Sequence, residues 1–163
     1  MAYMVVFTPM RWQVVKGSCL CGTVAFEVDP AGVAAVVGCY CEPCRKVSGS
    51  QYGVYYQVRR GAFRWLSGED GVAAFESSPG NLRGHCQTCG CTAPIATAYG
   101  AIRVPGGAFD EDPGVGPDVV IFERSKAGWC GLETGVHRFE DAGPPEFWRT
   151  LFVRMFAGGS ARG

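Results

Sequence analysis

Short segments with alternating apolar and polar residues dominate the chain. In residues 23–28 and 51–59, every second side chain is apolar. An alternation with a period of two predicts a β-strand with one buried face. Similar short segments, bounded by Gly, Pro, Ser or Asp residues, predict further strands at 33–38, 63–66, 72–76, 92–98 and 119–123. The pattern therefore predicts a mainly β protein built from antiparallel strands.

One segment has a helical period instead. It follows Pro144 and Pro145, which suit a first helical turn, and precedes Gly158 and Gly159, which suit a helix end. Its apolar residues recur at spacings of three and four: Phe147, Trp148, Leu151, Phe152, Met155 and Phe156. A short C-terminal helix over about residues 145–157 is predicted to pack over the sheet, with docking of a partner as the alternative. Residues 106–117, rich in glycine, are predicted to form a long loop.

Length and composition limit the organisation of the chain. Its 163 residues, 47% apolar and 18% charged, are typical of one folded domain. We therefore expect a single domain over residues 1–163, with a core at about 16–145. The 24 glycines and 10 prolines indicate frequent turns.

Charge and hydropathy argue against several partners. The 15 basic and 15 acidic side chains cancel, so no overall field favours nucleic acid, and no stretch has the length of a membrane span. The apolar run at 2–7 is too short for a secretory signal and lacks a basic flank. A cytoplasmic location is expected, and in that reducing compartment the nine cysteines indicate metal ligands or catalytic thiols instead of disulfides.

Eight of the cysteines form three clusters, at residues 19–22, 39–44 and 86–91. Cys86 and Cys89, followed by Gly90, have the spacing of a zinc knuckle, which supplies two ligands. Structural zinc needs four ligands, and Cys19 with Cys21 is the natural second pair.

That pairing leaves Cys39, Cys41 and Cys44 as a cluster of three ligands. Catalytic zinc sites commonly have three protein ligands and one open position, so this cluster is the candidate catalytic centre. Spacing alone leaves an alternative open, in which Cys41 and Cys44 complete a site with the Cys86 knuckle and the other cysteines are spare.

The neighbours of these clusters suggest further roles. Arg45 and Lys46 can offset thiolate charge and hold an anionic group of a substrate, and Ser48 can donate a hydrogen bond; a solvated turn is the alternative. Cys91 and Cys130 are expected to be small buried side chains, with Cys91 a possible fourth ligand. His85 adjoins Cys86 and can hydrogen-bond near a zinc-bound sulfur.

The clusters and their flanks resemble the glutathione-dependent formaldehyde-activating (GFA) family, whose domain also occurs in centromere protein V. The matching segments are residues 16–24, 39–49, 77–78 and 83–90, which read KGSCLCGTV, CYCEPCRKVSG, SS and RGHCQTCG. A weaker likeness at 122–129 extends the resemblance to about residues 16–145. The sequence departs from the family at Tyr40, where histidine is usual, and at Cys91, where serine is usual.

The resemblance implies an Mss-four-like fold of stacked antiparallel sheets with zinc knuckles. It also implies two zincs per chain, a structural one and a second, possibly catalytic one, held respectively by Cys19, Cys21, Cys86 and Cys89, and by Cys39, Cys41 and Cys44. The reaction implied is that of a carbon–sulfur lyase, which condenses glutathione with formaldehyde to S-(hydroxymethyl)glutathione. Arg45 or Lys46 would then meet a glutathione carboxylate.

Two other functions fit the same residues. A zinc-stabilised binding module would need only the structural zinc. A thiol redox enzyme of similar fold would use Cys91 or Cys130 as a working thiol with a low pKa.

Overall fold

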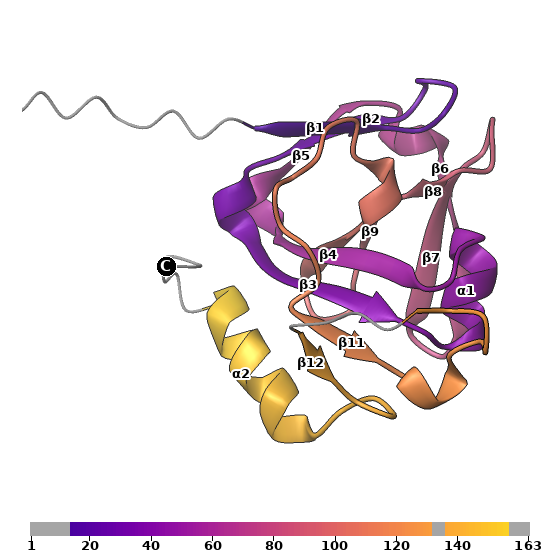
Figure 1. Ribbon diagram of the computed structural model, residues 1–163. Helices are drawn as coiled ribbons and strands as arrows, with labels where there is room; N and C mark the ends of the chain where they lie inside the picture. The colour runs from indigo at the N-terminus through magenta and orange to yellow at the C-terminus, as the bar shows by residue number, and fades with distance from the viewer. Residues whose placement is uncertain (1–13, 132–135, 157–163) are drawn as a thin grey trace, which may run out of the picture.

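The computed structural model describes residues 14–131 and 136–156, without the side chains of 154–156. Within these ranges the protein is mainly β, with several antiparallel sheets and two α-helices (Figure 1). The predicted fold class is therefore confirmed. The apolar run at 2–7 and the helix end at Gly158 and Gly159 lie outside the described residues. No helix in the described ranges is long and apolar enough to span a membrane.

The largest sheet has six strands. Their order is β12 (His137–Arg138), β11 (Val119–Ile121), β3 (Val33–Cys39), β4 (Gly53–Arg59), β10 (Ala101–Pro105) and β9 (Ile95–Ala96). The neighbouring strands β3 and β4, β4 and β10, and β10 and β9 pair antiparallel. In contrast, β11 pairs parallel with both β3 and β12. β11 is therefore an exception to the predicted antiparallel pairing, because the chain crosses from β10 through a long loop before it pairs beside β3.

Two smaller sheets complete the fold. One contains β1 (Val15–Ser18), β2 (Ala25–Val28) and β5 (Phe63–Ser67), and the other contains β6 (Val72–Ser78), β7 (Asn81–Cys86) and β8 (Thr92–Ala93). The strand predicted at 92–98 is divided into β8 and β9 around Pro94, which has no backbone N–H to donate to a ladder. Short 3-10 helices lie at Pro30–Gly32, Arg60–Ala62, Glu69–Gly71, Gly106–Ala108 and Glu123–Ser125.

The central strands β3 and β4 have two faces, one turned to the main core and the other to a cavity. Val36, Tyr56 and Val58 point to one side and pack with Phe26 of β2 in the main hydrophobic cluster. Side chains alternate along a strand, so Val37 and Cys39 of β3, with Tyr55 and Gln57 of β4, belong to the other side. The alternation predicted at 51–59 is thus confirmed, and its second face lines a cavity.

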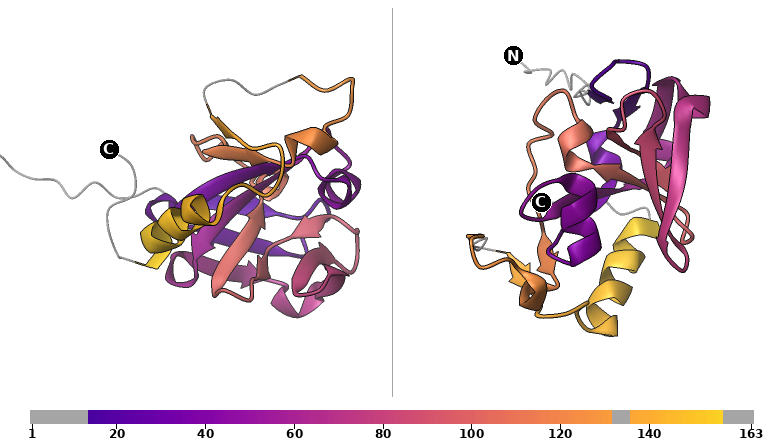
Figure 2. Two further views of the ribbon diagram at one scale, coloured as in Figure 1. Left: turned by 90° about the horizontal axis from the view of Figure 1, so that it is seen from below. Right: turned by 90° about the vertical axis from the view of Figure 1, so that its right-hand side faces the viewer.

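Two α-helices flank this second face. Figure 1 shows α1 (Glu42–Ser48) beyond the end of β3 and α2 (Pro145–Phe156) near its start, and Figure 2 shows the same two helices from two other sides. Helix α1 was not predicted from the sequence, because the segment is too short to display an apolar period. The helix has Pro43 in its first turn and ends at Gly49, which has φ 61°. The predicted C-terminal helix is confirmed as α2, which packs against β3 and β4.

Candidate functional site

A first cysteine cluster joins the β1–β2 connection to the turn after β7. The sulfurs of Cys19, Cys21, Cys86 and Cys89 all lie within 4.8 Å of one another. Sγ atoms are 3.4 Å apart between Cys19 and Cys21, and 3.8 Å apart between Cys21 and Cys86. A tetrahedral zinc with Zn–S bonds of about 2.3 Å separates its sulfurs by about 3.8 Å. The four sulfurs therefore fit a structural zinc ion.

Both halves of this cluster use the same local turn. The Gly22 amide donates to the Cys19 carbonyl and the Gly90 amide to the Cys86 carbonyl, each at 2.9 Å. Both glycines have φ 74°, a left-handed value that only glycine adopts readily. Backbone amides in the turn also stabilise thiolates: hydrogen bonds from the Cys91 and Cys21 backbone lower the pKa of Cys89 to about 6. Burial raises the pKa of Cys19 to about 11.

A second cluster lies where β3 meets α1. Cys39 ends β3, Cys41 is the residue before α1, and Cys44 is buried in the helix. Their three sulfurs also lie within 4.8 Å of one another, with 3.4 Å between those of Cys39 and Cys41. Tetrahedral zinc has four ligands and these sulfurs provide three, so the cluster fits a zinc ion with one open coordination position. The alternative pairing of Cys41 and Cys44 with the Cys86 knuckle is not the one the structure brings together.

Arg83 is the cation that faces this second cluster. It lies on β7 and is only 8% exposed. Its Nη2 donates to the Cys44 sulfur at 3.4 Å, and its Nε donates to the Ser77 hydroxyl at 3.1 Å. The hydrogen bond from the Cys39 thiol and the charge of Arg83 together lower the pKa of Cys44 to about 5. The sequence analysis missed Arg83, because 39 residues separate it from Cys44.

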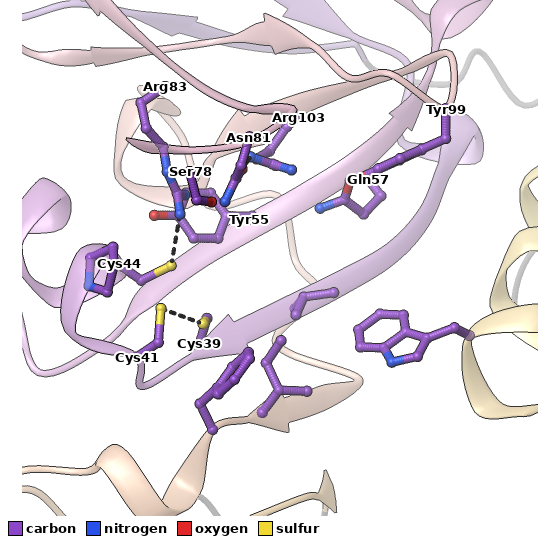
Figure 3. Close-up of a pocket in the computed structure, with 15 residues that line it drawn as sticks. Cys39, Cys41, Cys44, Tyr55, Gln57, Ser78, Asn81, Arg83, Tyr99 and Arg103 are labelled. Carbon is purple, nitrogen blue, oxygen red and sulfur yellow. Dashed lines mark hydrogen bonds between the residues drawn. The ribbon is translucent and has the colours of Figure 1, made fainter. Parts of the chain in front are cut away.

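A cavity of about 430 Å³ opens beside the three cysteines. Figure 3 shows Arg83, Ser78, Asn81 and Arg103 gathered along one side of it. The full lining is Val37, Cys39, Cys41, Pro43, Cys44, Tyr55, Gln57, Ser78, Asn81, Arg83, Tyr99, Arg103, Ile121, Phe122 and Trp148. Within the described part of the chain, this lining contains two arginines and no carboxylate. The cavity therefore favours an anionic ligand.

Two residues of this lining are held in unusual states. The Tyr55 hydroxyl is buried, and the described residues give it no hydrogen-bond partner. Phe122 has φ 56°, a left-handed conformation that is strained for a side chain of this size. Unsatisfied donors and strained backbone tend to concentrate at functional sites. Both observations support the cavity as the site of function.

The predicted substrate-binding residues lie on α1, away from this lining. Arg45 donates from Nε to the Tyr40 carbonyl at 3.2 Å, and Lys46 forms an exposed ion pair with Glu42 at 2.6 Å. Ser48 donates to the Cys44 carbonyl one turn earlier, at 2.8 Å. None of the three predicted residues lines the cavity, so their role in substrate binding gains no support from its geometry.

The remaining cysteines and His85 lie outside the cavity lining. Cys91 packs against the first cluster but is not one of its four grouped ligands. Cys130 is 7% exposed and packs with Tyr40 and Val120. His85 is half-buried on β7 and pairs with Thr92 of β8.

One family model matches most of this chain. No curated protein matches the sequence. A crystal structure of a Rhodobacter sphaeroides protein, a Northeast Structural Genomics target, is similar over 76% of this chain and 98% of that chain, with 18% identity and a TM-score of 0.48. The family model described as glutathione-dependent formaldehyde-activating enzyme matches residues 14–125, a range that contains both clusters. This chain therefore belongs to the glutathione-dependent formaldehyde-activating family.

Proposed function

We propose that this protein is a zinc-dependent carbon–sulfur lyase that adds the thiol of glutathione to formaldehyde and forms S-(hydroxymethyl)glutathione. The observation that carries the proposal is the cluster of Cys39, Cys41 and Cys44 at the wall of a cavity that also contains two arginines. Family membership supports the general activity, and the cavity supports an anionic small-molecule thiol as its ligand.

The two clusters divide the metal chemistry between them. The four sulfurs of the first cluster fill a tetrahedral site, whereas Cys39, Cys41 and Cys44 leave one position for a ligand. A zinc ion held by these three would supply a Lewis acid and a binding position for a thiolate. Arg83 offsets part of the negative charge of the three thiolates through its contact with the Cys44 sulfur.

The other polar side chains of the cavity suit the rest of the substrate. Arg103 donates from Nη1 to the Asn81 side chain at 2.7 Å and to the Leu82 carbonyl at 3.3 Å, which fixes the guanidinium at the wall. We assign to Arg103 the binding of a glutathione carboxylate, because planar guanidinium groups match carboxylates in two hydrogen bonds. This assignment replaces Arg45 and Lys46, which lie outside the lining.

The reaction requires one new bond and one proton movement. The S–C bond forms as the carbonyl double bond opens, and the proton lost by the thiol returns through water to the oxygen of the adduct. The unpartnered Tyr55 hydroxyl can donate a hydrogen bond to that oxygen while it carries negative charge. Val37, Ile121 and Phe122 add apolar side chains to the wall of the same cavity.

The test begins with zinc per chain on freshly reduced protein, followed by titration with glutathione. We expect two zincs, binding of glutathione, and a faster exchange between free formaldehyde and the adduct than in buffer, measured by exchange NMR. Cys41→Ser should lose one zinc and the acceleration, whereas Cys130→Ser, which changes a thiol outside both clusters, should retain both. One zinc per chain and no response to glutathione would instead support a zinc-stabilised binding module.

A further inference from the structure

A second, smaller cavity lies beside the first one, against α2. Its volume is about 170 Å³, and it shares Val37, Gln57, Tyr99 and Trp148 with the lining of the larger cavity. We call it the α2 alcove, lined by Ala35, Val37, Gln57, Tyr99, Trp148, Leu151 and Phe152. Because four residues belong to both linings, the alcove lies directly beside the cavity of the three-cysteine site.

The chemistry of the alcove differs from that of the larger cavity. Five of its seven lining residues, Ala35, Val37, Trp148, Leu151 and Phe152, have apolar or aromatic side chains. The Tyr99 hydroxyl donates to the Gln57 side-chain carbonyl at 2.8 Å, and the Tyr99 ring packs edge-on against Phe152 with centroids 5.2 Å apart. The charged residues Arg83 and Arg103 line only the larger cavity of the two. The alcove therefore suits a hydrocarbon group and disfavours a charged one.

The alcove lies at some distance from the reacting atoms. Val37 and Ala35 precede Cys39 by two and four residues on the same face of β3, so the alcove extends from roughly 7 to 13 Å along the strand from the cluster. Figure 3 shows Gln57 and Tyr99 on the opposite side of the cavity from Cys41 and Cys44. Formaldehyde has no substituent that could extend over this distance, and the polar groups of glutathione fit the arginine wall better.

We propose that the α2 alcove binds the alkyl chain of an aldehyde larger than formaldehyde, so that the protein forms hemithioacetals from medium-chain aldehydes. The proposal rests on the proposed function, since it uses the same three-cysteine site. The reaction is the same addition as with formaldehyde, in which one thiol and one aldehyde give one product. The S–C bond forms as the carbonyl double bond opens, and the thiol proton ends on the product oxygen. The alkyl chain takes no part except through binding.

Stable thioethers test the alcove without turnover. On zinc-loaded protein, calorimetry would compare S-hexylglutathione with S-methylglutathione, which share the peptide and differ in the chain that the alcove would bury. We expect S-hexylglutathione to bind at least about tenfold more tightly, because each buried methylene adds to affinity. In Ala35→Leu, which fills the alcove, this preference should fall to about twofold or less. Val153→Leu on α2, where Val153 is 59% exposed, is the matched control and should keep the preference.

The outcomes separate the two proposals. If neither thioether binds, the proposed function fails and this inference fails with it. If both bind equally well, the glutathione site stands and the alcove proposal is overturned. If Ala35→Leu does not fold, Ala35→Val replaces it, with an intermediate loss of preference expected. A preference for the hexyl chain that survives filling of the alcove would also overturn the proposal. With wild-type protein, exchange NMR should show acceleration with hexanal as well as with formaldehyde; acceleration with formaldehyde alone contradicts the inference.

Discussion

At the scale of single residues, the positive charge of the cavity comes from strands other than the one that carries Cys39. Arg83 contacts the Cys44 sulfur from β7, and Arg103 contacts Asn81 from β10. Both guanidinium groups lie near the Tyr55 ring, at 5.5 and 5.9 Å from its centroid. The Tyr55 ring thus lies beside both cations, and its hydroxyl remains without a partner among the described residues.

Replacement of Arg103 tests the assignment of a carboxylate partner. Arg103→Met should weaken glutathione binding by about tenfold or more, because a hydrogen bond between charged groups contributes about 1.5–3 kcal/mol. Arg60→Met makes the same change of charge at an exposed residue outside the cavity and should leave binding within about twofold. Titration calorimetry measures both. Equal losses in the two variants would show that the effect is one of net charge only.

Gly53 tests how tightly Tyr55 is held. A Cβ at Gly53 would lie 2.6 Å from the Tyr55 hydroxyl oxygen and 2.7 Å from a ring carbon. Gly53→Ala should therefore displace the ring and lower the free energy of unfolding by about 1–3 kcal/mol. Gly61→Ala is the control, because nothing lies within 4 Å of its Cβ. Urea unfolding measures the difference, and a Gly53→Ala protein as stable as Gly61→Ala would contradict the geometry.

At the scale of elements, β7 connects the two cysteine clusters. It contributes Cys86 to the first cluster and, three residues earlier, Arg83 to the second. The strand was missed in the sequence analysis because Gly84 interrupts the alternation of polar Asn81, Arg83 and His85 with apolar Leu82 and Cys86. Gly84 replaces a side chain at the place where a Cβ would lie 2.7 Å from the Ala93 carbonyl oxygen of β8. Close backbone packing thus removed the pattern by which strands are predicted.

An ion pair between the 3-10 helix at Glu123–Ser125 and β12 makes a pH-dependent contribution. The hydrogen bond from Arg138 lowers the pKa of Glu123 below its usual value of 4.5. A carboxyl whose pKa is lowered in the folded state stabilises the protein above its ordinary pKa, and the contribution is lost as pH falls through the folded pKa. Glu123→Gln should thus lower the urea midpoint slightly at pH 7 and not at all once Glu123 is protonated.

Glu140→Gln provides the comparison for this ion pair. Glu140 pairs with Arg124 at side-chain exposures of 78% and 72%, against 22% for Glu123 and 34% for Arg138. Solvent screens the more exposed pair, so its loss should change the midpoint less at every pH. An effect of Glu123→Gln that is the same at pH 7 and in acid would show that packing, and not charge, is responsible.

At the scale of the whole molecule, the first cluster joins two sheets. Cys19 and Cys21 follow β1, and Cys86 and Cys89 close β7 in another sheet. Val24, Trp65 and Val72 pack in the same buried cluster as Cys19 and Cys86, so sulfur ligation would strengthen an apolar contact between these two edges.

Removal of that link should have a large effect. Structural zinc has an apparent binding free energy of about 10–16 kcal/mol, which is comparable with or larger than the usual net stability of about 5–15 kcal/mol. A strong chelator or Cys86→Ala should therefore unfold much of the chain, seen as a large fall in Tm with loss of zinc. Cys130→Ala, also buried but outside both clusters, should cost only about 1 kcal/mol. An unchanged Tm after complete removal of zinc would contradict a structural role.

The sequence by itself determined the features that depend on near neighbours. The knuckle turns follow from cysteine spacing and a glycine with positive φ, and the buried faces of β2 and β4 and the helix α2 follow from period alone. Tertiary structure decided what depends on distant segments: the parallel pairing of β11, the contact of Arg83 with Cys44, and the α2 alcove. The reason is physical, because turns and side-chain alternation are set by local backbone geometry, whereas a cavity exists only where separately formed sheets and helices pack together.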